Sequence, residues 1–373
     1  MTDDPNWTVV VERVRGDSRL ARSAAPVARA VDIAHVRFSR ADVARQAAFL
    51  TDFGLTQSGA AEGWTALSGR GGYGPCYLLQ SGGDRFCGLG LAVGSHAELE
   101  RLAALPGASP IERALCWPEG EQVRLTDPAG NPVYALFGPV REPALPRASL
   151  SHNIDGELRR LNAMQRPPVQ AATVLRLGHA VLAVVDFFRC VRWYMDHFGL
   201  IASDIQTIGD GDPALVFMRC DRGDTPTDHH TLVIAQNVVN GFSHCAFECL
   251  DIDDIAMGQE WLHARGWKHA WGLGRHLLGS QIFDYWRDPV GTKHEHFIDS
   301  DKFTADRQVD VSPLTSGGLY QWGPPVPADF EKPRMTAGLL WKAVRNIRRS
   351  DELSFARAKA MMQALKAPPR PWH

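Results

Sequence analysis

The sequence lacks several features that mark whole classes of protein. Its seven cysteines are odd in number and form no Cys-x-x-Cys pair, which argues against a disulfide framework or a zinc ribbon and favours a reducing compartment. No run approaches the roughly 18 uncharged apolar residues of a membrane helix. The first twenty residues are polar and lack the apolar core of a secretion signal. We therefore expect a cytoplasmic protein that does not bind membranes.

An excess of basic charge is also missing. Forty Lys and Arg residues face 42 Asp and Glu residues, so the net charge is −2 and a nucleic-acid partner is not expected. The glycine-rich stretch 69–74 (GRGGYG) lacks the Lys-Ser/Thr ending of a phosphate-binding loop and is more typical of a hairpin loop. What is present is ordinary globular composition over 373 residues, enough for two domains with extensions.

Two parts of the chain repeat one plan. Residues 31–55 and 175–200 each open with an apolar strand, continue into a helix and end in Phe-Gly-Leu, where the glycine suits a helix C-cap. Residues 121–137 and 281–297 each place an Asp-Pro-x-Gly turn between two strands. The repeat predicts two domains of related fold.

The repeat also sets the expected boundaries. The stretch after residue 300 leaves the pattern: it predicts an ordered arm rich in Pro, Gly and Trp, followed by one basic amphipathic helix over 336–366. We expect such extensions to cover a cavity mouth or to join subunits of a homo-oligomer. The predicted parts are an extension at 1–30, a first domain at 31–140, a linker at 141–172, a second domain at 173–300, and an arm and helix at 301–373.

Three candidate metal ligands lie on three predicted strands of the second domain: His179, His244 and Glu295. Two neutral imidazoles and one carboxylate form a facial triad, which leaves three neighbouring coordination positions open. Strand alternation places Glu295 on the face opposite His294 and His296. A single strand histidine is more often structural than functional, so the residue types alone do not decide between the two.

Residues 173–301 resemble the catalytic half of the type I extradiol ring-cleavage dioxygenases, a family of the vicinal oxygen chelate superfamily. The resemblance rests on the segments LGHAVLAVVD, DHHTLVIAQ, FSHCAFECLDIDD and GLGRHLLGSQIFDYWRDPVGTKHEHFIDSD. The last segment departs from the family signature at Asp284, where an apolar residue is usual. The resemblance implies an α+β fold of two tandem domains, each made of paired βαβββ modules that form an open, barrel-like mixed sheet.

The resemblance also implies roles for individual residues. His179, His244 and Glu295 would bind iron(II), with manganese(II) left open as an alternative. His230, the second histidine of DHHT, would be the acid–base group. His229 is expected to point the other way, because neighbours on a strand alternate.

Two further residues, His276 and Tyr285, would hydrogen-bond the substrate oxygens. The implied reaction inserts both atoms of dioxygen into a catechol ring beside its two hydroxyls, giving a muconic-semialdehyde-type product. The catechol itself and the side of cleavage stay open. Two alternatives also stay open, a metal-dependent lyase or isomerase of the same superfamily and a metal-free protein that binds an aromatic compound.

The first repeat serves as an internal control on this assignment. Its His35 aligns with the first candidate ligand, but Gly88 and Tyr134 align with the second and third. Since neither can supply the missing imidazole or carboxylate, we expect the first domain to bind no metal.

Overall fold

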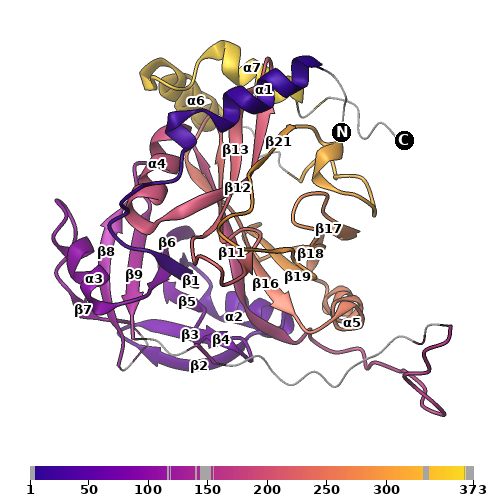
Figure 1. Cartoon of the computed structure of the whole chain (residues 1–373). Coiled ribbons are helices and arrows are strands. Elements are labelled where there is room, and N and C mark those ends of the chain that lie inside the picture. Colours follow the sequence, from indigo (N-terminus) through magenta and orange to yellow (C-terminus); the bar gives the residue numbers. More distant parts are fainter. Residues whose placement is uncertain are drawn as a thin grey trace.

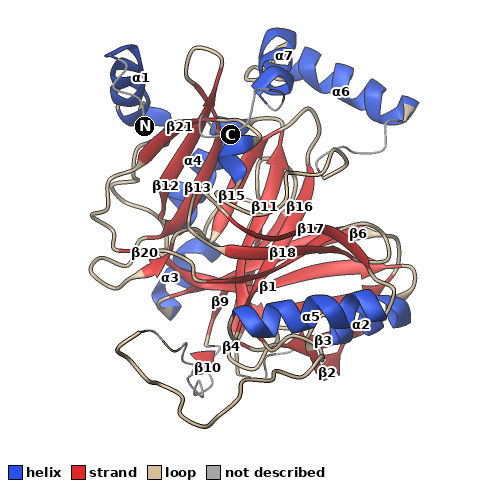
Figure 2. Cartoon of the chain, turned by 90° about the vertical axis from the view of Figure 1, so that its right-hand side faces the viewer, coloured by secondary structure: helices blue, strands red, loops and turns tan. Residues whose placement is uncertain are grey.

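Two large mixed sheets, one in each half of the chain, form the frame of the molecule (Figure 1). The computed structural model describes residues 5–115, 117, 119–138, 141–142, 153, 155–330, 336–364 and 366. Helices pack against the sheets (Figure 2), and the predicted α+β fold of two related domains is confirmed. The predicted linker at 141–172 and the two ends of the chain lie partly outside the described residues, and the predicted domain boundaries stay predictions.

The first sheet has the strand order β2-β3-β5-β1-β6-β9-β8-β7. Its elements follow the order strand, helix and three strands twice, apart from the two-residue β4 (Gly72–Tyr73), which pairs with β10 (Arg141–Glu142). They are β1 (Ala30–Arg40), α2 (Val43–Asp52), β2 (Thr56–Ala61), β3 (Trp64–Ser68), β5 (Tyr77–Ser81), β6 (Arg85–Val93), α3 (His96–Ala103), β7 (Glu112–Arg113), β8 (Glu121–Thr126) and β9 (Pro132–Phe137).

The second sheet repeats this plan in the order β17-β18-β19-β16-β11-β15-β13-β12-β21, in which the edge strand β21 (Asp310–Pro313) comes from the C-terminal arm. A short pair, β14 (Thr227–Asp228) and β20 (Lys302–Phe303), lies outside it. The main elements are β11 (Val174–Val184), α4 (Phe187–Phe198), β12 (Leu200–Ile208), β13 (Asp212–Cys220), β15 (Leu232–Gln236), β16 (Gly241–Cys249), α5 (Ile252–Ala264), β17 (Lys268–Arg275), β18 (Ile282–Arg287) and β19 (Lys293–Ile298). The paired βαβββ modules are therefore present in both halves.

The two Phe-Gly-Leu segments end the first helix of each half, as predicted. Gly199 caps α4 with φ +62°, and Gly54 follows α2 with φ +112°, both in the region that favours glycine. Gly54 is also constrained by packing, since a Cβ there would lie 2.1 Å from the carbonyl oxygen of Ala172.

The strand registers reproduce the alignment of the two repeats. In the first sheet His35 pairs with Gly90, which pairs with Tyr134. In the second sheet His179 pairs with Ala246, which pairs with Glu295. Gly88 and His244, each two residues earlier on the middle strand, therefore occupy equivalent positions, and the predicted correspondence between the repeats is confirmed.

The back of strand β19 packs against the first domain. His296 stacks on Phe53 with ring centroids 3.7 Å apart and hydrogen-bonds the Phe53 carbonyl at 2.7 Å. His294 lies among aromatic rings of the same domain. Nearby, Arg40 and Asp288 form a buried ion pair at 3.0 Å across the same boundary. These contacts confirm that Glu295, between the two histidines, faces the other way.

Replacing Phe53 by alanine is therefore expected to destabilise the protein. Phe53 is fully buried between the two halves, so the variant leaves a cavity at their contact and loses the stack on His296. A loss of about 3–5 kcal/mol is usual for such a change. Urea unfolding measures it, with Phe355→Ala as control, because Phe355 is 60% exposed. Equal stability of both variants would contradict the importance of this contact.

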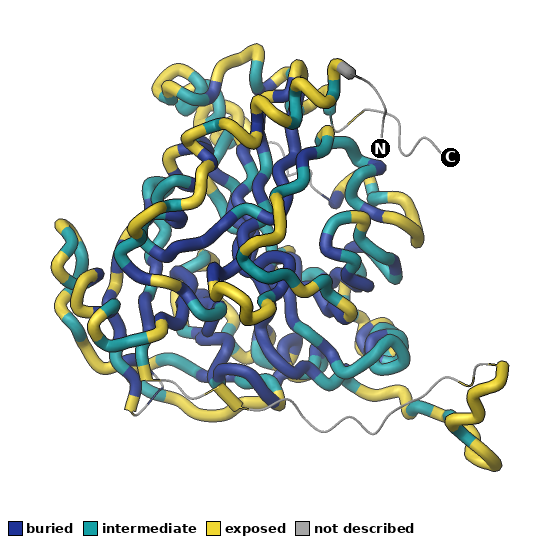
Figure 3. The backbone as a smooth tube through the Cα atoms, in the orientation of Figure 1, coloured by how far each residue is buried: buried dark blue, intermediate teal, exposed yellow. Residues whose placement is uncertain are grey.

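The extensions pack mainly on the second half of the chain. They comprise α1 (Pro5–Arg15), η1 (Ser18–Leu20), β21 (Asp310–Pro313), η2 (Gly317–Leu319), α6 (Ala337–Arg349) and α7 (Phe355–Ala364). Helices α1, α6 and α7 lie at the end of the molecule remote from the first sheet (Figures 1 and 2). Buried positions concentrate along the two sheets, whereas α6 is largely exposed (Figure 3). Among the described residues, no helix is long and apolar enough to cross a membrane.

The prediction of one helix over 336–366 is wrong, because the chain breaks between α6 and α7. At the break, the Glu352 carboxylate accepts hydrogen bonds from the backbone N–H groups of Phe188 and Arg189, at 2.7 and 3.0 Å. It thereby caps the first turn of α4, where unpaired N–H groups need an acceptor. Ser350 binds Asp186 at the same helix end. A continuous helix could not make these tertiary contacts.

Candidate metal centre and its surroundings

The second sheet brings His179, His244 and Glu295 together on one face. They lie on the adjacent strands β11, β16 and β19, and one possible ligand atom from each lies within 4.8 Å of the others. The registers explain this arrangement: Ala246 stands between His179 and Glu295, and His244 is two residues away on the same face of β16. Three side chains far apart in the sequence thus converge on one point.

The carboxylate of Glu295 is the feature of this cluster that indicates a cation site. Glu295 is fully buried, and among the described residues neither carboxylate oxygen has a hydrogen-bond donor in proper geometry. The Nε2 atoms of His179 and His244 approach its Oε2 to 3.3 and 3.5 Å. A buried, unsatisfied charge is costly. The two imidazoles and the carboxylate therefore fit a divalent metal ion, which would satisfy all three.

The protonation states also suit metal binding. Burial lowers the pKa of His244 to about 4, against the opposing effect of Glu295, so its imidazole is neutral at pH 7. Burial alone would raise the pKa of Glu295, but the imidazoles of His179, His244 and His276 hold it well below the usual range. A neutral imidazole and an ionised carboxylate are the forms that coordinate metals.

His276 and Tyr285 border this cluster. The Nε2 of His276 lies 3.0 Å from the Tyr285 hydroxyl and 3.5 Å from Oε1 of Glu295. Its Nδ1 lies 2.6 Å from the carbonyl oxygen of Leu319 in the C-terminal arm, so the arm orients the ring. The Tyr285 ring stands edge-on to His244 at 5.3 Å. Both predicted residues are thus within reach of a molecule held at the ligand cluster.

His230 and His229 point in different directions, as expected, although the expected reason is wrong. Neither lies in a strand: both stand in the bend between β14 and β15. The His230 ring lies 4.1 Å from that of His179, whereas His229 turns away toward Asp204. Burial lowers the pKa of His230 well below its ordinary value. The structure therefore brings His230, and not its neighbour, to the ligand cluster.

Asp284, the departure from the family signature, lies on the other side of the sheet. It is fully buried and accepts hydrogen bonds from Trp286 Nε1 at 2.6 Å and Gln259 Nε2 at 2.9 Å. His269 Nε2 lies 2.8 Å from it. Because it points away from its neighbour Tyr285, it does not line the candidate site, and these polar partners explain how the sheet accommodates it.

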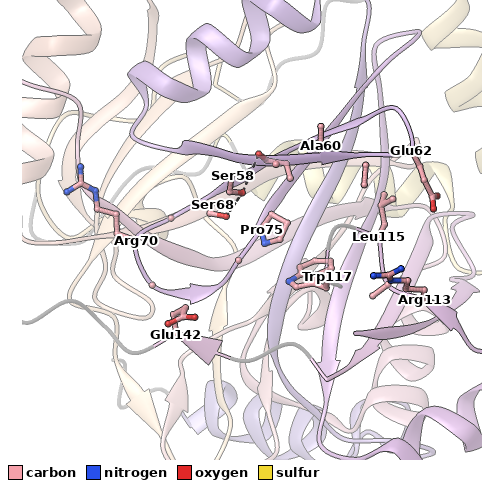
Figure 4. Close-up of a pocket in the computed structure, with 17 residues that line it drawn as sticks. Ser58, Ala60, Glu62, Ser68, Arg70, Pro75, Arg113, Leu115, Trp117 and Glu142 are labelled. Carbon is pink, nitrogen blue, oxygen red and sulfur yellow. Dashed lines mark hydrogen bonds between the residues drawn. The ribbon is translucent and has the colours of Figure 1, made fainter. Parts of the chain in front are cut away.

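The equivalent position of the first domain is arranged differently. Arg37 donates a hydrogen bond to Nε2 of His35 at 2.7 Å, and its guanidinium lies over the Tyr134 ring. A separate hollow of about 650 Å³ opens in the same domain, with Trp117, Arg113 and Glu142 on its wall (Figure 4). None of the residues predicted to act in catalysis or metal binding lines this hollow.

Comparison with known proteins places the chain among enzymes of known chemistry. The sequence profile of the Glyoxalase/Bleomycin resistance protein/Dioxygenase superfamily matches residues 176–295. Metapyrocatechase 2 of Cupriavidus necator is 30% identical over 318 residues, covering 83% of this chain and 95% of that protein. Biphenyl-2,3-diol 1,2-dioxygenase of Pseudomonas sp. strain KKS102 is 26% identical over 221 residues, covering 53% and 64%.

Solved structures support the fold alone, since their identity to this chain is low. The Mn(II)-bound glyoxalase of Novosphingobium aromaticivorans has a TM-score of 0.67 at 21% identity, covering 83% of this chain and 97% of its own. Homoprotocatechuate 2,3-dioxygenase of Arthrobacter globiformis has a TM-score of 0.65 at 20% identity, covering 84% and 94%. Because both a glyoxalase and a dioxygenase match equally well, the fold does not distinguish their reactions.

Proposed function

The chain belongs to the extradiol ring-cleavage dioxygenases of the glyoxalase, bleomycin resistance protein and dioxygenase superfamily, and on that premise we propose that it cleaves the ring of a catechol with dioxygen. The observation that carries the proposal is the buried, unsatisfied carboxylate of Glu295 between His179 and His244, with His230 beside them. A lyase or isomerase with the same metal ligands has no evident use for a histidine at position 230.

In this proposal His179, His244 and Glu295 hold the metal ion. The ligand set suits iron(II) and also manganese(II); we propose iron(II). When bound, the ion would bring the catechol oxygens and dioxygen together and let electron density pass between them. With domains at 31–140 and 173–300, this site lies in the second domain. The first domain packs behind strand β19 through Phe53 and Arg40.

The remaining predicted residues would handle protons and orientation. His230 is buried and neutral, so it can take a proton from a catechol hydroxyl and later return it to an oxygen of the opening ring. The Tyr285 hydroxyl, near His276, can donate a hydrogen bond to the deprotonated catechol oxygen. His276 is held by Leu319 of the arm, so this part of the site depends on the C-terminal extension.

Aromatic side chains beside the cluster suit a planar substrate. Trp271 stacks on Tyr285 at 5.7 Å, and Phe330 of the arm stands edge-on to both rings. These residues belong to a buried aromatic cluster at the border of the ligand face. Offset and edge-on contacts with such rings stabilise an aromatic ligand. In this proposal, such a wall would favour a catechol ring over a small aliphatic substrate.

The decisive experiment follows oxygen in the presence of catechols. Protein loaded anaerobically with iron(II) is mixed with unsubstituted, alkyl-, carboxyl- and aryl-substituted catechols in an oxygen electrode. We expect one O2 to be consumed per catechol, with a yellow ring-opened product. Turnover of other substrates without oxygen uptake would favour the lyase or isomerase alternative. Protein that binds catechols but retains no iron or manganese would favour the metal-free binding protein.

A further inference from the structure

A buried chain of three side chains leads away from the candidate metal centre. Nε2 of His229 lies 2.5 Å from Oδ2 of Asp204, and its Nδ1 lies 2.9 Å from Nδ1 of His230. All three residues are at most 5% exposed. The chain begins on strand β12 and ends where the His230 ring lies beside His179.

We propose that Asp204 and His229 are positioning residues that hold the proton of His230 on Nδ1 and leave its Nε2 bare for the substrate. The inference rests on the proposed acid–base role of His230 and specifies which of its two nitrogens acts. Neither Asp204 nor His229 is placed to touch the substrate; both act through His230.

The hydrogen bonds determine the tautomers in sequence. An ionised carboxylate can only accept, so His229 must donate from Nε2 to Asp204. A neutral imidazole protonated on Nε2 has a bare Nδ1, which must then accept from Nδ1 of His230. A neutral His230, the form that can act as a base, carries a single ring proton, and the hydrogen bond to His229 places that proton on Nδ1. Its Nε2 is consequently left without a proton, in the form required to act as a base.

The surroundings of His229 prevent the ring from leaving this arrangement. Its backbone N–H donates to the carbonyl of Asp301 at 2.9 Å. Gly279 packs directly on the ring, since a Cβ there would lie 2.9 Å from Nδ1. Phe217 and Phe303 approach with ring centroids at 5.6 and 5.4 Å. Because the His229 ring is held in place, its hydrogen bond to Asp204 determines which nitrogen it presents to His230.

Asp204 is suited to serve as the fixed end of the chain. Burial raises the pKa of its carboxyl, the hydrogen bond from His229 opposes that shift, and the charge of Asp310 adds to it. The neighbouring carboxylate, Asp310, pairs with Asp204 in strand register but is bound to Arg307 at the surface. Asp310 therefore offers a matched control, an acid of the same charge on the adjacent strand outside the chain of hydrogen bonds.

The first test reads the tautomer directly in the metal-free protein. Nitrogen NMR of protein labelled with 15N-histidine distinguishes a protonated from a bare ring nitrogen, and His230→Gln identifies the signals of residue 230. We expect a protonated Nδ1 and a bare Nε2. In Asp204→Asn, whose amide can either donate or accept, we expect a mixture of both tautomers. A wild-type His230 protonated on Nε2 would overturn the inference, whatever the protein catalyses.

The second test separates positioning from support of the fold. With metal-loaded enzyme, Asp204→Asn is expected to lower kcat about ten- to a hundredfold, as loss of an outer-shell partner does, with KM within about twofold. Asp204→Glu restores a carboxylate and should recover part of kcat. If residue 204 only supported the fold, glutamate should be tolerated less well than asparagine, because its side chain is larger. Asp310→Asn should leave kcat unchanged. Equal kcat in Asp204→Asn and wild type would contradict the positioning role. If the wild type showed the expected tautomer but cleaved no catechol, only the proposed function would be refuted.

Discussion

Replacing Glu295 by glutamine is expected to lower the affinity for the metal by more than about a hundredfold and to abolish oxygen uptake. Loss of a residue that only supports a ligand usually costs about ten- to a hundredfold in metal affinity, and loss of a ligand itself should cost more. The amide has the shape of the carboxylate but lacks its charge, and Glu295 is the only acidic member of the ligand cluster among the described residues. Because the residue is fully buried between His179 and His244, no water-exposed acid can replace it there. Metal analysis after gel filtration, and oxygen uptake with the preferred catechol, measure the two effects.

The matched control is Glu260→Gln on helix α5, which removes the same charge at an exposed position. It should retain metal and activity. The thermal unfolding of Glu295→Gln in the metal-free state should still be cooperative, because the substitution preserves volume in a packed sheet. A Glu295→Gln variant that keeps one equivalent of metal per chain would show that other groups hold the ion, and the ligand assignment would have to be abandoned.

The fold and the ligand cluster could be predicted because their signals are periodic and local. Two Phe-Gly-Leu helix ends and two Asp-Pro-x-Gly turns disclose the repeat, and the strand registers found in the structure match it residue for residue. Strand alternation was sufficient to place Glu295 opposite its two histidine neighbours. The residue types by themselves would not have singled out these ligands from fourteen histidines; the resemblance around DHHT and DPVGTKHE did so.

What could not be predicted depends on contacts between distant segments. Asp204 lies on strand β12, 25 residues before His229 in its bend, and no local motif marks it as a partner. The carbonyl of Leu319 that orients His276 belongs to an arm outside the repeat. The break between α6 and α7 arises because Glu352 caps α4, more than 160 residues away. In each case the structure is determined by contacts between distant segments. Such contacts leave no local pattern in a single sequence, so they could not be predicted from it.

Replacing His230 by glutamine or phenylalanine is expected to leave metal binding intact and to lower kcat about a hundred- to ten-thousandfold, the usual range for loss of a general acid–base group. His230 is not among the three ligands, yet its ring lies 4.1 Å from that of His179. Glutamine keeps a polar group there and phenylalanine keeps the volume, but neither can take up a proton at neutral pH. Stopped-flow absorbance of the ring-opened product, with metal content measured on the same samples, separates the two effects.

The control for histidine removal is His96→Gln: His96 lies at the surface of the first domain, away from the ligand cluster, and pairs with Glu100 and Glu121. Its kcat should equal that of the wild type. If His230→Phe turned over at the wild-type rate with its metal bound, the acid–base assignment would be wrong, and the proton would have to be taken by His276 or Tyr285, which also border the ligand cluster. If the variant lost its metal instead, His230 would support the ligand His179, and its closeness to that ring would be a packing contact and not a catalytic one.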